Sequence, residues 1–118
     1  MKLYDAHNHL QDERLQPWID GILRTLPDLG IVCAVVNGTS EADWEQVARL
    51  ARQHCWIKPA FGLHPWFVKN RTPRWRDTLQ RYLEEFPAAA VGEIGLDRWI
   101  ADPDIQAQED GPGPVRLA

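Results

Sequence analysis

The fold of this protein follows from a stretch near its N-terminus, Leu3–His9, which reads LYDAHNH. Leu3–Ala6 is short and apolar apart from Asp5, as in a strand, and two histidines follow it directly. Side chains two residues apart on a strand point to the same face, so His7 and His9 are able to converge on one cation. A strand that ends in side chains of this kind is typical of an enzyme built on parallel strands.

Three further segments have the composition of strands. Ile31–Val36 is a continuous apolar run, which predicts a parallel strand covered on both faces. Ile57–Gly62 and Ala88–Ile94 complete the set of four strand candidates.

Amphipathic helices are predicted between these strands. Apolar residues recur at the helical period from Trp18 to Leu26, and Ser40–Asp43 forms a capping-box pattern that opens a second helix. A third helix is predicted to start at Thr72-Pro73 and to end before Pro87. Strands that alternate with such helices predict right-handed crossovers and a parallel sheet, either open and doubly wound or closed into a barrel.

Polar residues follow each strand candidate and favour the barrel. Asn37 follows the second strand, His64 the third, and Glu93 and Asp97 lie at the end of the fourth. The C-terminal ends of barrel strands open on one shared mouth, where such groups meet. We therefore predict an α/β fold that is the N-terminal half of a (β/α)8 TIM-type barrel, with four parallel strands and three to four helices.

The histidine pair and Glu93 are the candidate metal ligands. Neutral imidazole suits divalent transition metals, although two solvated or hydrogen-bonded histidines at a strand end are the structural alternative for His7 and His9. Glu93 lies in an otherwise apolar strand, where a carboxylate is costly unless it is paired or bound to a cation. A salt bridge from Glu93 to a buried arginine is the alternative there.

The loop after His64 is basic and aromatic, and it contains the candidate substrate-binding residues Arg71 and Arg74. Cations near the first turn of a helix oppose its dipole, so helix stability does not explain Arg74 and Arg76. Phosphate contacts and base stacking would explain them, and a solvated basic loop is the alternative. The whole cluster comprises Lys69, Arg71, Arg74 and Arg76 with Trp66, Phe67 and Trp75.

The pattern offers two roles each for His64 and Asp97 and places His54 outside the site. His64 either contacts substrate or is a packed histidine fixed by Pro65. Asp97 either orients a ligand from outside the coordination sphere or caps the following turn. His54 lies at the end of the second helix, where it would meet the helix dipole, and we place it outside the site.

Three blocks of the sequence together resemble the first signature blocks of the TatD family. These blocks are Asp5–His9, Gly62–Trp66 and Val91–Asp97, and the resemblance extends to about Glu109. The first block alone also occurs in other amidohydrolase-type barrels and in PHP-type phosphoesterases. A PHP-like phosphoesterase, however, does not account for the block around Glu93.

The resemblance implies a metal-dependent hydrolase that acts on DNA or another phosphodiester with one or two divalent ions (Mg²⁺, Mn²⁺ or Zn²⁺). By this match His7 and His9 would bind one metal, and Glu93 would bind or bridge the metals and act in catalysis. His64 would act near the substrate phosphate, and Asp5 and Asp97 would support the ligands. The metal would lower the pKa of a water molecule that attacks phosphorus.

The family's pattern includes further ligands, two histidines and an aspartate on later strands, that these 118 residues do not contain. A full barrel takes about 250 residues, so we expect residues 1–109 to form a partial, truncated barrel with impaired catalysis. Residues 110–118 predict an irregular tail, and our hypothesis is that the reading frame is lost near residue 110 or that the gene is a truncated remnant. The alternative function is a non-catalytic half-barrel that pairs with itself or with a partner fragment through open sheet edges.

Composition places few limits on these functions. The net charge of −4 argues against a dedicated nucleic-acid-binding module but not against an enzyme that cuts nucleic acid. No N-terminal signal pattern and no apolar run of membrane-spanning length is present, so we expect a cytoplasmic protein that does not contact a membrane. Cys33 and Cys55 are expected to be inert, semi-buried thiols.

Overall fold

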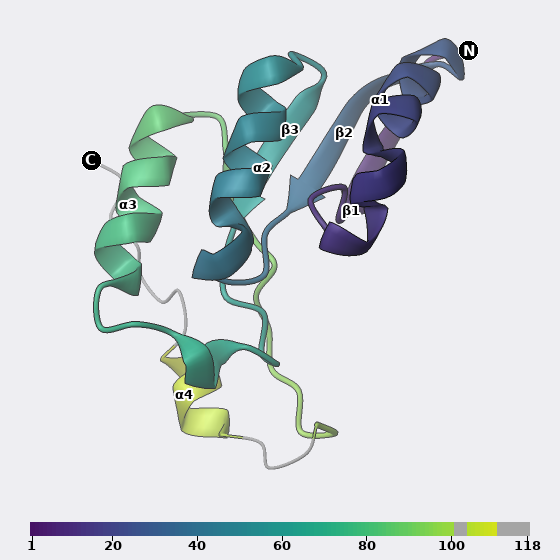
Figure 1. Ribbon diagram of the computed structural model, residues 1–118. Coiled ribbons are helices and arrows are strands. Elements are labelled where there is room, and N and C mark those ends of the chain that lie inside the picture. The colour runs from purple at the N-terminus through teal and green to yellow at the C-terminus, as the bar shows by residue number, and fades with distance from the viewer. Residues whose placement is uncertain (101–103, 111–118) are drawn as a thin grey trace.

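The computed structural model describes residues 1–100 and 104–110. Their core is a four-stranded parallel sheet in the order β1-β2-β3-β4, in which each strand pairs with its sequence neighbour (Figure 1). The strands are β1 (Leu3–Asn8), β2 (Ile31–Asn37), β3 (Ile57–Phe61) and β4 (Ala90–Val91). The predicted parallel arrangement of four strands is therefore confirmed.

Helices connect the strands and cover one face of the sheet (Figure 1). The α-helices are α1 (Ile19–Asp28), α2 (Glu41–Gln53), α3 (Trp75–Glu85) and α4 (Ile105–Glu109), and two 3-10 helices, η1 (Glu13–Trp18) and η2 (Val68–Asn70), precede α1 and α3. The capping box predicted for α2 is present, because the Asp43 carboxylate accepts a hydrogen bond from the Ser40 N–H at 3.2 Å.

The core lies between the sheet and the helices α2 and α3. Trp44 from α2, Phe61 from β3 and Leu79 from α3 have no measurable solvent exposure. On β2, Ala34 and Val36 are fully buried beneath the helices, whereas the alternating residues Ile31, Cys33 and Val35 are only partly buried. The prediction that this strand is covered on both faces is therefore wrong for the described residues, because the helices cover one face only.

Two helix boundaries differ from the prediction. The third helix starts at Trp75 rather than at Thr72-Pro73, because the Glu41 carboxylate accepts hydrogen bonds from the Thr72 N–H and hydroxyl at 2.7 and 2.6 Å. These bonds hold Thr72 against α2 and outside the helix. Trp18 ends η1 and is 65% exposed, so it does not belong to the apolar face of α1 as predicted.

The fourth strand is much shorter than the predicted Ala88–Ile94. Its pairing with β3 ends at Val91 because the chain then crosses toward β2, where the Glu93 N–H donates to the Gly38 carbonyl at 2.8 Å. Glu93 therefore lies beyond the strand rather than inside it. Of the two free thiols, Cys33 is semi-buried as predicted, but Cys55 is exposed because it lies in the turn between α2 and β3.

Three further predictions concern the C-terminal tail, membrane contact and association through the sheet edges. Residues 111–118 are outside the described residues, so the predicted irregular tail and the division at residue 109 stay predictions. Within residues 1–100 and 104–110, none of the helices has the length and apolar composition needed to span a membrane. Association through the outer strands β1 and β4 also stays a prediction.

Candidate metal centre

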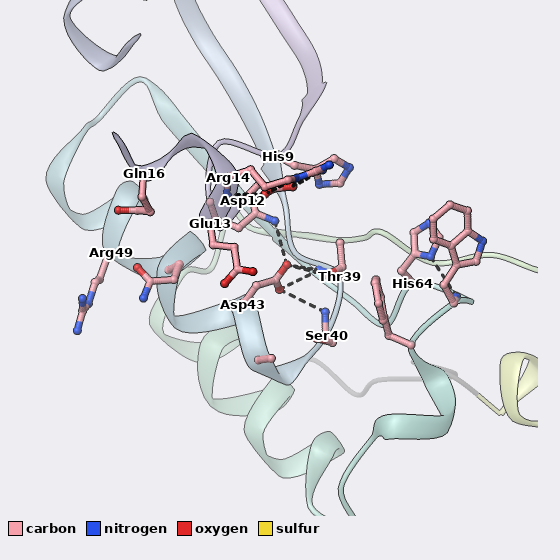
Figure 2. A pocket seen from close by; sticks show the side chains of 15 residues that line it. His9, Asp12, Glu13, Arg14, Gln16, Thr39, Ser40, Asp43, Arg49 and His64 are labelled. Atoms are coloured by element: carbon pink, nitrogen blue, oxygen red, sulfur yellow. Dashed lines mark hydrogen bonds and ion pairs between the residues drawn. The ribbon is translucent and has the colours of Figure 1, made fainter. Parts of the chain in front are cut away.

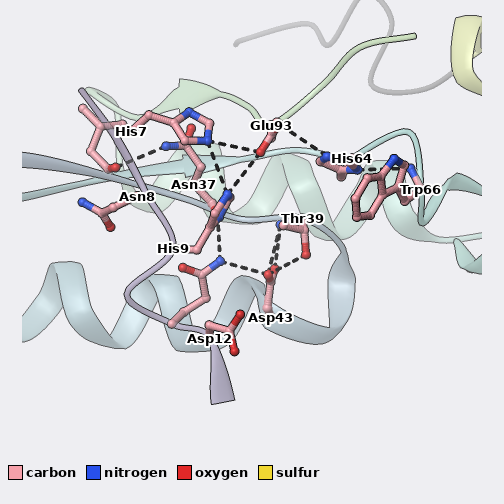
Figure 3. A network of polar contacts seen from close by, with 12 residues as sticks. His7, Asn8, His9, Asp12, Asn37, Thr39, Asp43, His64, Trp66 and Glu93 are labelled. Carbon is pink, nitrogen blue, oxygen red and sulfur yellow. Dashed lines mark hydrogen bonds and ion pairs between the residues drawn. The ribbon is translucent and has the colours of Figure 1, made fainter. Parts of the chain in front are cut away.

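Three ligand-type side chains converge where β1 and β4 end. The Glu93 Oε2 atom lies 3.3 Å from the Nε2 atom of His7 and 3.3 Å from the Nε2 atom of His9, and the two Nε2 atoms are themselves 3.3 Å apart (Figure 3). All three ligand atoms lie within 4.8 Å of one another, a grouping able to hold a metal ion. The sheet therefore brings together the three metal ligands expected from the sequence.

Gly62 makes this convergence possible. A Cβ atom at Gly62 would lie 2.7 Å from both the Glu93 carbonyl oxygen and the Gly92 carbonyl carbon, which is closer than such atoms approach. The chain after β4 is therefore able to cross closely over the end of β3 only because residue 62 has no side chain. This crossing places Glu93 opposite the two histidines of β1.

The hydrogen bond of His9 determines which ring nitrogen faces Glu93. The Nδ1 atom of His9 lies 2.8 Å from the Asn37 carbonyl oxygen, and a carbonyl only accepts, so Nδ1 carries the proton. In the neutral ring Nε2 then presents its lone pair to the Glu93 carboxylate and to His7. A lone pair against a carboxylate is repulsive unless a proton or cation lies between them. The donor set therefore fits a divalent cation.

The Asn37 carbonyl is itself fixed by a buried residue that sequence reasoning missed. Gln11 is 5% exposed, and its Nε2 group donates to the Asn37 oxygen at 2.7 Å and to the Asp43 carboxylate at 3.0 Å. Asp43 also accepts from the backbone and hydroxyl of Thr39 (Figure 3). A polar residue three positions after the end of β1 was the only sequence signal for Gln11.

His64 belongs to the same cluster. Its Nδ1 atom accepts from the Trp66 N–H at 3.1 Å, so in the neutral ring Nε2 carries the proton. That nitrogen lies 3.4 Å from the Oε1 atom of Glu93, on the opposite side of the carboxylate from His7 and His9 (Figure 3). Glu93 therefore has one oxygen toward the histidine pair and one toward His64.

Asp5 and Asp97 lie beside this cluster rather than in it. The Asp5 carboxylate accepts from the His7 N–H at 3.1 Å and from the Asn8 amide at 3.0 Å, so it orients the backbone that carries the histidine. Asp97 accepts from the Trp66 indole at 2.8 Å and from the Trp99 N–H at 2.8 Å. These two bonds, chiefly the one from Trp66, hold the pKa of Asp97 below its usual value.

The predicted phosphate-binding arginines lie in the loop before α3. Arg71 donates to the Val68 carbonyl at 2.6 Å, and Arg74 is exposed. Arg76, in the first turn of α3, lies over the Trp75 ring, with its guanidinium carbon 5.1 Å from the ring centroid. Among the described contacts, none joins these arginines to the histidine cluster, so their substrate-binding role stays a prediction.

A pocket of about 840 Å³ adjoins the cluster (Figure 2). His9 and His64 line one part of it, and Arg49 of α2 lines another. The pair of Asp12 and Arg14 also lines the pocket, and the hydrogen bonds from Arg14 lower the pKa of Asp12 to about 2. The volume is in the range of small-molecule sites, about 300–1,000 Å³.

The fold and the cluster together define part of a (β/α)-barrel with a metal-type site at the C-terminal ends of its strands. A family model described as TatD related DNase matches residues 4–111. The chain therefore belongs to the TatD-related DNase family, as its three sequence blocks indicated. This match favours neither the PHP-like phosphoesterase nor the non-catalytic half-barrel.

Named relatives agree with this family. The chain is 32% identical over 110 residues to the 3'-5' ssDNA/RNA exonuclease TatD of Erwinia tasmaniensis. This match covers 89% of this chain and 42% of that protein. It is 29% identical over 110 residues to the uncharacterized metal-dependent hydrolase YjjV of Escherichia coli K12, covering 92% of this chain and 42% of that protein.

The crystal structure of YjjV, a TatD homolog from Escherichia coli K12, matches the fold with a TM-score of 0.79 and 29% identity. The match covers 91% of this chain and 42% of the YjjV chain. The four parallel strands and their helices thus form the predicted N-terminal half of a TIM-type barrel. The chain spans about 42% of the length of these relatives.

Proposed function

We propose that this chain binds a divalent metal ion and carries part of a site that hydrolyses phosphodiester bonds in nucleic acid. The observation that supports it best is the convergence of three ligand atoms, the Nε2 atoms of His7 and His9 and the Oε2 atom of Glu93, each 3.3 Å from the other two. The names of the relatives, a single-stranded DNA/RNA exonuclease and a metal-dependent hydrolase, agree with this chemistry.

In this proposal each residue of the cluster has a separate task. His7, His9 and the Oε2 atom of Glu93 hold the ion, and Asn37 fixes His9 through its carbonyl group. When bound, a divalent ion supplies Lewis-acid stabilisation of phosphate oxygens and activates water. The protonated Nε2 atom of His64 lies on the other side of Glu93 and would donate a hydrogen bond to a phosphate oxygen of the substrate.

Arg71 and Arg74 remain proposed phosphate contacts. Arg71 would have to release the Val68 carbonyl to reach a phosphate, whereas Arg74 is already exposed. The ion is proposed to be Mg²⁺, Mn²⁺ or Zn²⁺, since imidazole with carboxylate accepts each of them. The bound polymer is proposed to be DNA or another phosphodiester.

A titration with Mn²⁺ tests the metal site directly, by isothermal calorimetry on the intact chain. We expect saturable binding that is lost in the His7→Ala, His9→Ala double variant, because two of the three ligands are then removed. Metal binding is the readout because the chain covers only about 42% of its relatives.

The control is His54→Ala, since His54 caps the C-terminus of α2 and lies outside the cluster. This variant is expected to bind Mn²⁺ as the unmodified chain does. Binding that survives the double variant, or that is lost equally in His54→Ala, would contradict the proposed site.

A further inference from the structure

One aromatic side chain of the basic loop is exposed next to the metal centre. Trp75 is 6% exposed and belongs to the core, and Phe67 is part-buried, whereas Trp66 is 60% exposed. The three aromatic residues that the sequence groups together therefore have different surroundings. Only Trp66 presents most of its ring to solvent.

Trp66 is held in place although it is exposed. Its indole N–H donates to the Asp97 Oδ2 atom at 2.8 Å, and its backbone N–H donates to His64 Nδ1 at 3.1 Å. Its ring also meets the His64 ring edge to face, with centroids 5.0 Å apart and planes at 74°. A ring fixed in this way loses little conformational entropy when a ligand covers it.

Trp66 lies beside the metal centre, where the proposed nucleic-acid substrate would bind. His64 lies between Trp66 and Glu93, and its other side is 3.4 Å from the Oε1 atom of Glu93 (Figure 3). Trp66 also lines the pocket of about 840 Å³ together with His9 and His64. A nucleotide whose phosphate lies at the metal centre would thus have its base beside an exposed aromatic ring.

We infer that Trp66 is a stacking platform for an unpaired base of single-stranded nucleic acid, and that Asp97 is a positioning residue that holds the indole. This inference rests on the proposed function, because the phosphate at the metal centre brings the base to Trp66. Aromatic rings bind successive bases by stacking, without selecting a particular base, since every base has a π-face. The pair of Asp97 and Trp66 also accounts for an aspartate whose described hydrogen bonds include none to His7, His9 or Glu93.

The test compares a fluorescein-labelled oligothymidylate with an abasic oligomer of the same length, by fluorescence anisotropy on the intact chain. The two polymers carry the same phosphates and differ only in their bases. We expect the chain to bind the oligothymidylate more tightly, and Trp66→Ala to weaken that binding by about five- to hundredfold. Binding of the abasic oligomer should change little.

Two substitutions separate stacking from the hydrogen bond. Trp66→Phe keeps an aromatic face but lacks the indole N–H that Asp97 accepts, so it should lose a part of the preference similar to that lost in Asp97→Ala and much smaller than that lost in Trp66→Ala. Asp97→Ala leaves the ring unanchored and should lose part of that preference. Trp18→Ala is the control, because Trp18 is similarly exposed at 65% and does not line the pocket.

The measurement is made both with Mn²⁺ and with EDTA. A wrong metal site and a wrong stacking role then give different binding results. If the chain does not bind Mn²⁺ but still prefers the oligothymidylate through Trp66 in EDTA, only the proposed metal site is contradicted. If Trp66→Ala weakens both oligomers equally, or if the chain does not distinguish them, the stacking role is overturned.

Discussion

At the residue scale, Gly62 sets the approach of Glu93 to the histidines. Gly62→Ala would place a Cβ atom 2.7 Å from the backbone of Gly92 and Glu93, so the crossing chain must move away. We expect the affinity for Mn²⁺ to fall by about tenfold, the lower end for disturbed ligand geometry. Calorimetric titration of the variant measures this loss.

The matched control is Gly21→Ala in α1, where an added Cβ atom meets no atom within 4 Å. This change should raise the free energy of unfolding by about 0.5–1 kcal/mol, because alanine loses less entropy than glycine in a helix. Its Mn²⁺ affinity should stay at the level of the unmodified chain. If Gly62→Ala binds Mn²⁺ equally well, the glycine does not control the site.

At the element scale, Asp43 ties the start of α2 to the loops that follow β1 and β2. Its carboxylate accepts from Thr39, Ser40 and Gln11 at 2.7 to 3.2 Å. Asp43→Ala would remove a helix cap and leave the donors of the buried Gln11 and the partly buried Thr39 without this acceptor. We expect the free energy of unfolding to fall by about 1–3 kcal/mol, measured by urea denaturation.

Asp77→Ala serves as the comparison, since Asp77 is also acidic in a first helical turn but is exposed on α3. Loss of its interaction with the helix dipole should change the free energy of unfolding by less than about 1 kcal/mol. An equal loss in both variants would mean that Asp43 acts only through the dipole of α2.

At the scale of the whole molecule, α2 and α3 are joined by a polar cluster that makes stability depend on pH. Tyr82 donates to Glu45 at 2.6 Å, and Arg52 pairs with Glu45 and Glu85 at 2.8 Å. Burial, followed by the bond to Glu45, raises the pKa of Tyr82 to about 12 from its usual value of 10.0. Hydrogen bonds lower the pKa values of Glu45, from Tyr82 first, and of Glu85, from Arg52.

A raised pKa in the folded state means that the neutral tyrosine is stabilised by folding. The contribution of Tyr82 to the free energy of unfolding is thus complete below pH 10.0 and is lost as the pH rises toward about 12. The two glutamates contribute above their usual pKa of 4.5 and lose their contribution as the pH falls below it. We therefore expect the midpoint temperature of thermal unfolding to decrease as the pH falls below 4.5 and as it rises above 10.0.

Tyr82→Phe isolates the alkaline part of this dependence. The phenylalanine variant should be less stable near neutral pH, and the difference from the unmodified chain should shrink as the pH rises from about 10 to about 12. Parallel melting curves over that interval would show that Tyr82 does not contribute through its ionisation.

The sequence by itself determined the order of the elements and the residue types of the site. Apolar runs, helical periodicity and the capping box are local signals, and they placed four strands and three helices within a few residues. His7 and His9 lie two apart at the end of one strand, so their common direction also followed from local geometry. Glu93 followed from a carboxylate in an otherwise apolar segment, and the family's sequence blocks agreed with it.

Only the tertiary structure decided how these residues meet. The approach of Glu93 depends on Gly38 and Gly62, which lie far from it in sequence, and no periodicity encodes that crossing. The same is true of the exposure of Trp66 and the burial of Trp75, two aromatic residues of one short stretch of sequence. Burial depends on which elements pack together, and a local pattern does not contain that information.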